Sequence, residues 1–228
     1  MKHGKKYNAS VKKYDRSLEL EAPAACALVK DLHYAAFDET VEVHIRLNVK
    51  KSQSVRDTVV LPHQFRGEKK ILVFCKPDKE KEALEAGAAY VGSDELIEKV
   101  KGGWLDFDVA VATPDMMKDV GKLGMVLGRK GLMPNPKTGT VTHDLKAAVA
   151  ELRKGRTEFR TDKSGIVHLA IGKVSMESAQ VSENLATLLE EIGRKRPSDA
   201  KGEFVSSVFL SSTMGPSVHV AVAKSEKR

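Results

Sequence analysis

The sequence has little cysteine and few aromatic residues. Its two cysteines, Cys26 and Cys75, lie far apart and neither belongs to a paired-ligand spacing, which argues against a thiol-rich zinc site. No apolar run reaches the roughly 18 residues that a membrane helix requires, and residues 1–13 lack the apolar stretch of a secretory signal. We therefore expect a cytoplasmic protein with reduced, buried thiols and no metal site.

The motifs of common enzyme classes are also missing. The apolar segment Lys70–Cys75 leads into Lys76-Pro77-Asp78 and not into a Gly-x-Gly-x-x-Gly turn, and the glycines between residues 121 and 131 match neither that spacing nor a P-loop. The sequence has no His-x-x-x-His pair and no Gly-x-Ser-x-Gly elbow. We expect no cofactor, no catalytic residues and no enzymatic activity. An enzyme or regulator whose middle domain binds a nucleotide remains the alternative.

What the sequence does have is an excess of basic residues, with a formal net charge of +7. Residues 1–66 carry a net +4 and residues 160–228 a net +2, whereas residues 67–159 carry only +1. Because phosphates attract Lys and Arg, this distribution favours a polyanionic partner bound mainly by the two ends of the chain.

The two ends share a pattern of short alternating strands and single helices. Thr40–Lys50 places valine, isoleucine and leucine at every second position, which is the period of a strand with one buried face. The pattern predicts helices over 21–34 and 177–192, and strands over 40–50, 57–61, 157–161, 166–171, 204–211 and 217–223. Such a mixture is typical of an α+β domain.

The middle of the chain differs, because its strands are continuous apolar runs that alternate with charged helices. Lys70–Cys75 and Phe107–Ala112 have the composition of fully buried parallel strands. The pattern predicts strands over 70–75, 90–91 and 107–112, helices over 78–86, 94–101 and 144–154, and a long exposed loop over 121–139. We therefore predict a parallel α/β domain at 67–159, inserted into an α+β domain made of 1–66 and 160–228.

One candidate for RNA contact is the segment Ala36–Thr40. Phe37 could pack beside RNA sugars, while Glu39 and Thr40 could form hydrogen bonds to 2′-hydroxyls. The alternative is a plain helix-to-strand turn with Phe37 in the core.

Two further candidates are turns in the second basic end. Phe159–His168 is a predicted hairpin from which Arg160, Lys163 and His168 project. Ser211–Ser217 is a hydroxyl-rich turn in which Gly215 would let the backbone approach a ribose-phosphate chain. A solvated hairpin and an ordinary turn are the alternatives.

Several segments occur together and in order: Ala36–Val43, Val55-Arg56 with Leu61–His63, Gly128–Gly139, Arg160–His168 and Thr213–Pro216. Together they resemble the bacterial form of the L-one family, the large-subunit ribosomal proteins of the mobile stalk beside the transfer-RNA exit site. The resemblance runs from Tyr7 to Ala223.

This resemblance implies a split RNA-binding domain formed by both chain ends, an inserted Rossmann-like domain and two hinge strands between them. It implies a structural constituent of the large ribosomal subunit that binds stalk ribosomal RNA, assists release of deacylated exit-site transfer RNA and represses its own operon by binding messenger RNA. A free repressor acting off the ribosome would use the same surface. With Arg160 from the hairpin, the implied RNA-binding residues are Phe37, Thr40, Lys163, Gly165, His168, Thr213, Met214 and Gly215.

The sequence departs from the family pattern at three positions. Ala36 stands where the family usually has lysine, which predicts one phosphate contact fewer, and Asp57 and Gln64 stand where glycines are common. The loop Gly128–Gly139 is intact and offers Arg129, Lys130 and Lys137 for a secondary RNA contact, or it serves only the shape of the middle domain.

Overall fold

The computed structural model describes residues 4–50, 54–197 and 202–222 of the 228-residue chain. The chain divides into two compact units. The split unit consists of Met1–Phe65 and Phe159–Arg228, and the inserted unit is Arg66–Glu158. Both ends of the chain therefore contribute to one unit, from which the chain departs after Phe65 and to which it returns at Phe159.

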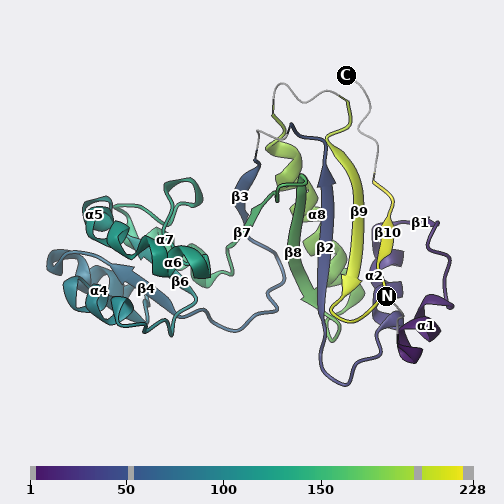
Figure 1. Ribbon diagram of the computed structural model, residues 1–228, viewed down its shortest axis with the longest axis horizontal. Helices are drawn as coiled ribbons and strands as arrows, with labels where there is room; N and C mark the ends of the chain where they lie inside the picture. Colours follow the sequence, from purple (N-terminus) through teal and green to yellow (C-terminus); the bar gives the residue numbers. More distant parts are fainter. Residues whose placement is uncertain (1–3, 51–53, 198–201, 223–228) are drawn as a thin grey trace. The chain divides into compact units, whose positions relative to one another are not determined.

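The split unit is built on a five-stranded sheet with the strand order β1-β10-β9-β2-β8 (Figure 1). β2 is antiparallel to both of its neighbours, β8 and β9, while β10 is antiparallel to β9 and the short β1 is parallel to β10. The strands are β1 Glu19–Leu20, β2 Thr40–Leu47, β8 Ile166–Lys173, β9 Val205–Ser212 and β10 Val218–Val220. A strand from the first end of the chain thus lies between two strands from the second end.

Two helices, α2 (Ala22–Leu32) and α8 (Ser178–Arg194), cover one face of this sheet (Figure 1). A shorter helix, α1 (Lys5–Val11), precedes β1. α2 has a proline in its first turn, where a missing backbone N–H leaves no hydrogen bond unmade. The apolar faces of α2 and α8 form one hydrophobic core with the sheet.

The alternation of β2 decides which of its side chains enter that core. Val43 and Ile45 are fully buried, whereas Glu42 and His44 beside them point to the other face and stay partly exposed. Among the described residues, no helix packs on the face that carries His44. We call this side of the sheet the open face.

A two-stranded ribbon pairs β3 (Arg56–Val59) with β7 (Thr157–Arg160). The Asp57 carboxylate lies 2.5 Å from the Lys195 ammonium, so an ion pair joins β3 to the residue after α8. The ion pair gives Asp57 a structural role in the split unit.

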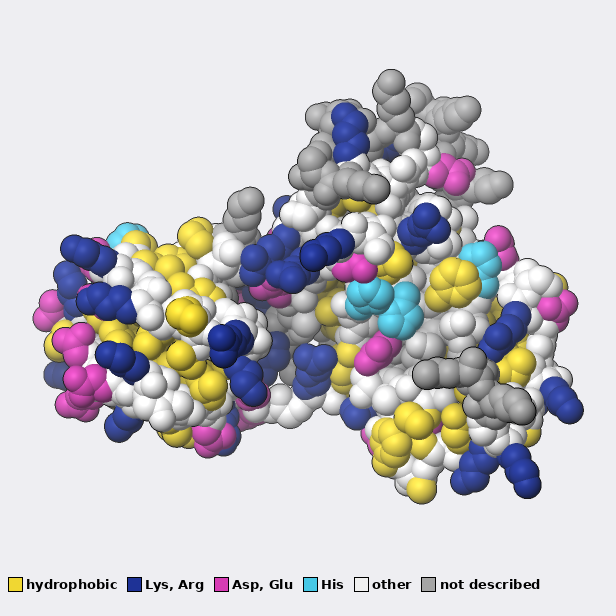
Figure 2. Space-filling model, viewed as in Figure 1, with side chains coloured by type: hydrophobic (Ala, Val, Ile, Leu, Met, Phe, Trp, Pro, Cys, Tyr) yellow, Lys and Arg dark blue, Asp and Glu magenta, His cyan; other side chains and the backbone are white. Residues whose placement is uncertain are grey.

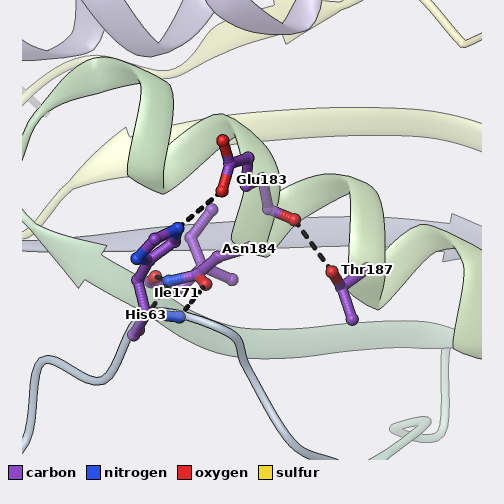
Figure 3. Close-up of polar contacts among 5 residues, drawn as sticks. All are labelled: His63, Ile171, Glu183, Asn184 and Thr187. Carbon is purple, nitrogen blue, oxygen red and sulfur yellow. Dashed lines mark hydrogen bonds and ion pairs between the residues drawn. The ribbon is translucent and has the colours of Figure 1, made fainter.

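The segment that follows β3 is fastened to the helix layer by Asn184 of α8 (Figure 3). The Asn184 side chain accepts a hydrogen bond from the His63 N–H at 2.9 Å and donates to the carbonyls of His63 at 2.9 Å and Ile171 at 2.8 Å. The His63 ring lies 2.6 Å from the Glu183 carboxylate. Asn184 is fully buried, so these bonds satisfy a polar side chain that would otherwise destabilise the core.

The inserted unit contains a three-stranded parallel sheet with the order β5-β4-β6. Its strands are β4 Ile71–Phe74, β5 Tyr90–Gly92 and β6 Val109–Ala112. All four residues of β4 are fully buried, because apolar clusters cover the sheet on both faces. The continuous apolar run seen in the sequence thus belongs to a central parallel strand.

The helices of the inserted unit lie on both sides of this sheet. They are α3 Glu80–Glu85, α4 Asp94–Lys101, α5 Met117–Val120, α6 Gly124–Lys130 and α7 Leu145–Arg153, with single 3-10 turns η1 Pro77–Lys79, η2 Pro114–Met116, η3 Gly121–Leu123 and η4 Pro136–Thr138. One cluster packs α4, α5 and α6 against the sheet, and the other packs α3 and α7. The predicted fold class, an α+β unit made from both chain ends with a Rossmann-like parallel α/β unit inserted, is confirmed.

The prediction of a long exposed loop over 121–139 is wrong for residues 121–130, although Lys122, Arg129 and Lys130 are exposed as predicted. The segment begins with η3 and α6, and Leu123 and Leu127, four residues apart, are buried in the core of the inserted unit. Burial of Leu123 in η3 and of Leu127 in α6 stabilises this helical segment more than its glycines weaken it. α6 ends at Gly131, whose φ of 71° lies in the left-handed region that favours glycine.

Candidate nucleic-acid interface

Two segments that are far apart in sequence meet at one end of the sheet. The Thr213 hydroxyl accepts a hydrogen bond from the Thr40 N–H at 3.1 Å and donates to the Thr40 carbonyl at 3.3 Å. The Tyr34 hydroxyl donates to the Met214 carbonyl at 2.7 Å. We call Phe37, Thr40, Thr213, Met214 and Gly215 the turn cluster. The structure brings these five candidates together because β2 and β9 are neighbours.

A buried carboxylate, Glu39, holds the turn cluster in place. One of its oxygens accepts the Ala35 N–H at 3.1 Å and the other accepts the Met214 N–H at 2.8 Å. Burial favours the neutral acid, but the backbone hydrogen bonds, that of Met214 first, outweigh it and lower the pKa of Glu39 below its ordinary value. The expectation that Glu39 would contact RNA sugars is wrong, because the side chain is fully buried.

Two large apolar side chains of the turn cluster face solvent. Phe37 is 54% exposed and Met214 is 51% exposed. The alternative in which Phe37 belongs to the core is therefore excluded. An exposed phenyl ring and a thioether, next to ordered backbone groups, offer a surface on which sugars or bases can pack.

Gly215 has a local structural reason to be glycine. A Cβ atom at this position would lie 2.4 Å from the Ser212 hydroxyl oxygen, and Ser212 is buried. A Cβ atom at position 215 would therefore force the Ser212 hydroxyl group to move.

At the other end of the sheet, the turn between β7 and β8 presents a second group. The Asp162 carboxylate accepts the N–H groups of Ser164 and Ile166, each at 2.8 Å, and these bonds, Ile166 first, lower the pKa of Asp162. Gly165 has a φ of 78°, a conformation that other residues rarely adopt. We call Arg160, Lys163, Gly165 and His168 the hairpin cluster.

Beside this hairpin lies a polar pocket of about 510 Å³. Its lining includes three basic residues, Arg46, Lys50 and Lys163, and one acidic residue, Asp162, so the basic residues are in excess. A pocket with this lining suits a phosphate group. Arg46 and Lys50 were missed by the sequence reasoning, although the alternation of Thr40–Lys50 already placed both on the polar side of the strand.

His168 pairs with His44 across β8 and β2. Their Nδ1 atoms lie 2.8 Å apart, so one ring donates its proton to the other. Burial and the neighbouring His168 lower the pKa of His44, which favours its neutral form. His168 also lies 3.6 Å from the Asp162 carboxylate, which connects it to the turn.

The turn cluster and the hairpin cluster lie at opposite ends of β2. Thr40 is in register with Lys173, whereas Arg46 is in register with Ile166. Arg46 follows Thr40 by six residue steps along the extended strand, which corresponds to roughly 20 Å. A ligand that touched both clusters would have to extend along the sheet.

The remaining candidates belong to the inserted unit. Arg129 and Lys130 are exposed in the last turn of α6. The side chain of Lys137 lies outside the described part of the structure. Two exposed cations at one helix end could attract a polyanion, but they do not form a pocket that would select a particular ligand.

Ala36 and Gln64 are exposed. Ala36 adjoins Phe37 and adds no charge to the turn cluster. Among the described residues, no three potential ligand side chains come together in a group that could hold a metal ion. None of the described helices combines the length and apolar character needed to cross a membrane.

Comparison with known proteins gives consistent matches. The model of the ribosomal protein L1p/L10e family matches residues 29–216. A protein of Treponema denticola named large ribosomal subunit protein uL1 is 67% identical over 220 residues, which cover 96% of this chain and 97% of that protein. A protein of the same name from Treponema pallidum subsp. pallidum is 63% identical over 227 residues, which cover 100% of this chain and 100% of that protein. The protein of this name from Borrelia hermsii is 57% identical over 219 residues, which cover 96% of this chain and 98% of that protein.

Proposed function

The chain belongs to the ribosomal protein L1p/L10e family, and from this we propose that it is a structural constituent of the large ribosomal subunit that binds ribosomal RNA through its split unit. The names of its relatives support the assignment to the large subunit. The observation that carries the choice of surface is the joining of Thr40 and Thr213, 173 residues apart, into one exposed cluster.

The proposed contact surface consists of the turn cluster and the hairpin cluster. In the turn cluster, Phe37 and Met214 pack against the RNA, while Thr213 and the backbone around it position the chain. In the hairpin cluster, Arg160 and Lys163 neutralise phosphates, and Gly165 shapes the turn that presents Lys163 and His168. This is recognition of RNA shape, because no pattern of base-specific side chains is required.

The finer parts of the proposal concern other RNA molecules and the limits of the domains. We propose that the chain also assists release of exit-site transfer RNA and represses its own operon by binding a similar fold in messenger RNA. Arg129 and Lys130, together with Lys137, provide a secondary RNA contact. Residues 1–66 and 160–228 form the RNA-binding domain of a cytoplasmic protein, and 67–159 form a separate domain; the excess charge of the two ends supports this division.

The test is a filter-binding titration of the purified protein against the stalk fragment of large-subunit ribosomal RNA, over a salt series and with duplex RNA as competitor. Thr213→Ala removes both hydrogen bonds to Thr40 and should weaken binding by about 1–3 kcal/mol. Thr213→Ser keeps the hydroxyl and is the matched control, with an expected change near zero.

Binding to the stalk fragment that is no tighter than binding to the competitor would contradict the proposal. Equal affinities of the alanine and serine variants would remove the Thr213 hydroxyl from the site. Thermal unfolding of both variants, measured in parallel, separates a lost RNA contact from a lost fold.

A further inference from the structure

Two histidines from opposite ends of the chain meet on the open face of the split unit. His44 on β2 is in register with His168 on β8, and the two residues are 124 positions apart in the sequence. Directly opposed residues lie on the same side of a sheet, so both imidazole rings share the open face. No local spacing of ligands indicates this pair in the sequence, because only strand pairing brings its members together.

The two rings face each other through the same nitrogen atom. Their Nδ1 atoms lie 2.8 Å apart, and the ring centroids are 5.0 Å apart. In the hydrogen-bonded pair one proton lies between these atoms, so one ring donates and the other accepts. Convergent imidazole nitrogens are also the donor atoms that zinc, copper and nickel ions prefer.

The spacing of the two nitrogens is close to what a metal ion requires. Zinc lies about 2.0–2.1 Å from each imidazole nitrogen that binds it, so two such nitrogens in a tetrahedral site are roughly 3.3 Å apart. The Nδ1 atoms of His44 and His168 therefore have to separate by about 0.5 Å. Rotation of the rings about χ2, a torsion with broad preferences, is sufficient for a shift of this size.

The second nitrogen of each ring also has a partner. The Nε2 atom of His168 lies 3.6 Å from the Asp162 carboxylate, which two backbone N–H groups hold in place, and the Nε2 atom of His44 lies 3.3 Å from the Ser211 hydroxyl oxygen. When both Nδ1 atoms bind a metal ion, the proton of each ring is on Nε2, where Asp162 and Ser211 can accept it. Partners that orient a metal-binding imidazole in this way are a recurring feature of metal sites.

The histidine pair is accessible to an ion from solvent. α2 and α8 pack on the opposite face of the sheet, the His168 side chain is 51% exposed and His44 is partly exposed. The Glu42 carboxylate acts electrostatically on His44 and favours a positive charge there. Together with Asp162 it offsets the charge of Arg46, the next outward residue on β2. Figure 2 shows neighbouring histidine side chains on this face, with acidic side chains beside them.

We propose that His44 and His168 form a zinc site, in which the two Nδ1 atoms bind one Zn²⁺ ion and water molecules complete its coordination. Zinc fits such a site because its d electrons impose no geometry of their own. Structural zinc sites have four protein ligands and catalytic sites have three, so two ligands predict zinc that binds reversibly. The ion would join β2 to β8 and thereby one end of the chain to the other. This inference goes beyond the proposed function, since zinc binding requires no RNA.

The test is isothermal titration calorimetry of the full-length, tag-free protein with zinc chloride. Magnesium chloride is the control for the ion, because Mg²⁺ prefers oxygen ligands. His44→Gln and His168→Gln each remove one of the two imidazoles. His219→Gln is the matched control, because it removes a partly exposed histidine from the same face of the sheet, two strands away from His44.

We expect a zinc ion whose binding is lost in His44→Gln and in His168→Gln and retained in His219→Gln, and no comparable binding of Mg²⁺. The ¹⁵N chemical shifts of the imidazoles should show zinc on Nδ1 and a proton on Nε2 in both rings. Ser211→Ala removes the hydroxyl partner of His44 and should weaken zinc binding by about 10-fold. Zinc should raise the Tm of the unsubstituted protein, because an ion that binds only the folded state stabilises it.

Three outcomes would overturn the inference. The first is a zinc affinity that is unchanged in both His44→Gln and His168→Gln. The second is an equal loss of affinity in His219→Gln, because zinc would then bind histidines without regard to their geometry. The third is coordination through Nε2 of either ring. The nitrogen shifts are measured on the unsubstituted protein, so they decide even where a thermal melt shows that a variant does not fold.

Discussion

At the scale of single residues, the site depends on a carboxylate that is fully buried and still charged. Glu39 receives N–H groups from Ala35 and Met214, and thereby ties the segment after α2 to the turn after β9. A charged acceptor strengthens such hydrogen bonds, which explains why an acid can occupy a core position. The residue acts by positioning Phe37 and Met214.

Glu39→Gln is expected to destabilise the protein by about 1–3 kcal/mol at neutral pH, because the amide group presents a donor to one of the two backbone N–H groups. The folded-state pKa of Glu39 is lowered, so its contribution is fully present above the ordinary carboxyl value of 4.5 and is lost as pH falls through the lower folded value. Urea unfolding at a series of pH values from neutral to acid measures the contribution of Glu39 to the free energy of unfolding. Glu42→Gln, on the exposed side of the same strand, should change stability by less than about 0.5 kcal/mol, and an equal loss in both variants would contradict the role of Glu39.

Two glycines of the split unit should respond to alanine with opposite signs. Gly165 has a φ of 78°, and a Cβ there would lie 3.1 Å from the Leu47 carbonyl oxygen, so Gly165→Ala should destabilise by about 1–2 kcal/mol. Gly193 lies in the last turn of α8 with open space around it, so Gly193→Ala should stabilise by about 0.5–1 kcal/mol. Chemical denaturation measures the free energy of unfolding of both variants. Free-energy changes of the same sign in the two variants would contradict this prediction.

At the scale of elements, hydrogen bonds from α8 attach the segment after β3 to the helix layer of the split unit. Asn184 supplies three hydrogen bonds to backbone groups of His63 and Ile171 (Figure 3). They hold residues 61–65, the last part of the split unit before the chain enters the inserted unit, against α8 and β8.

Asn184→Ala should destabilise the split unit by about 1–3 kcal/mol, since it removes the hydrogen-bond partner of the buried Ile171 carbonyl and of the partly buried His63 backbone. Thr187→Ala, one turn further along α8, is the matched control: its hydroxyl returns only to the Glu183 carbonyl of the same helix, so a change below about 0.5 kcal/mol is expected. Hydrogen exchange of the His63 amide gives a local readout. Unchanged protection of this amide in Asn184→Ala would show that the anchor is not needed.

At the scale of the whole molecule, the net charge of the split unit should govern affinity for RNA. Lys163→Gln removes one cation from the basic pocket, so the slope of log affinity against log salt concentration should fall in magnitude by about 0.7–0.9. Lys99→Gln, on α4 of the inserted unit, should leave the slope unchanged. Filter binding over a salt series measures both, and equal slopes for the two variants would mean that charge acts without regard to its location.

Much of the fold follows from local pattern. The period of two in Thr40–Lys50 identified β2, the apolar run Lys70–Cys75 identified β4, and Asp94–Lys101 was predicted with the bounds of α4. The loop over 121–139 was mispredicted, because the burial of Leu123 and Leu127 in the core of the inserted unit outweighs the helix-breaking tendency of nearby glycines. The local pattern predicted an element correctly where the intrinsic propensity of its residues agreed with the burial of their side chains in the fold.

The candidate site divides in the same way. The sequence by itself determined the family, the fold class and the basic character of both ends. It also nominated Phe37, Lys163 and Thr213 as candidate binding residues, because these lie in short recognisable segments. Only the tertiary structure decided that Thr40 meets Thr213, that Glu39 is buried and that His44 pairs with His168. These relations depend on the register of strands from opposite ends of the chain, and register is set by long-range backbone pairing and shared burial, which no local segment encodes.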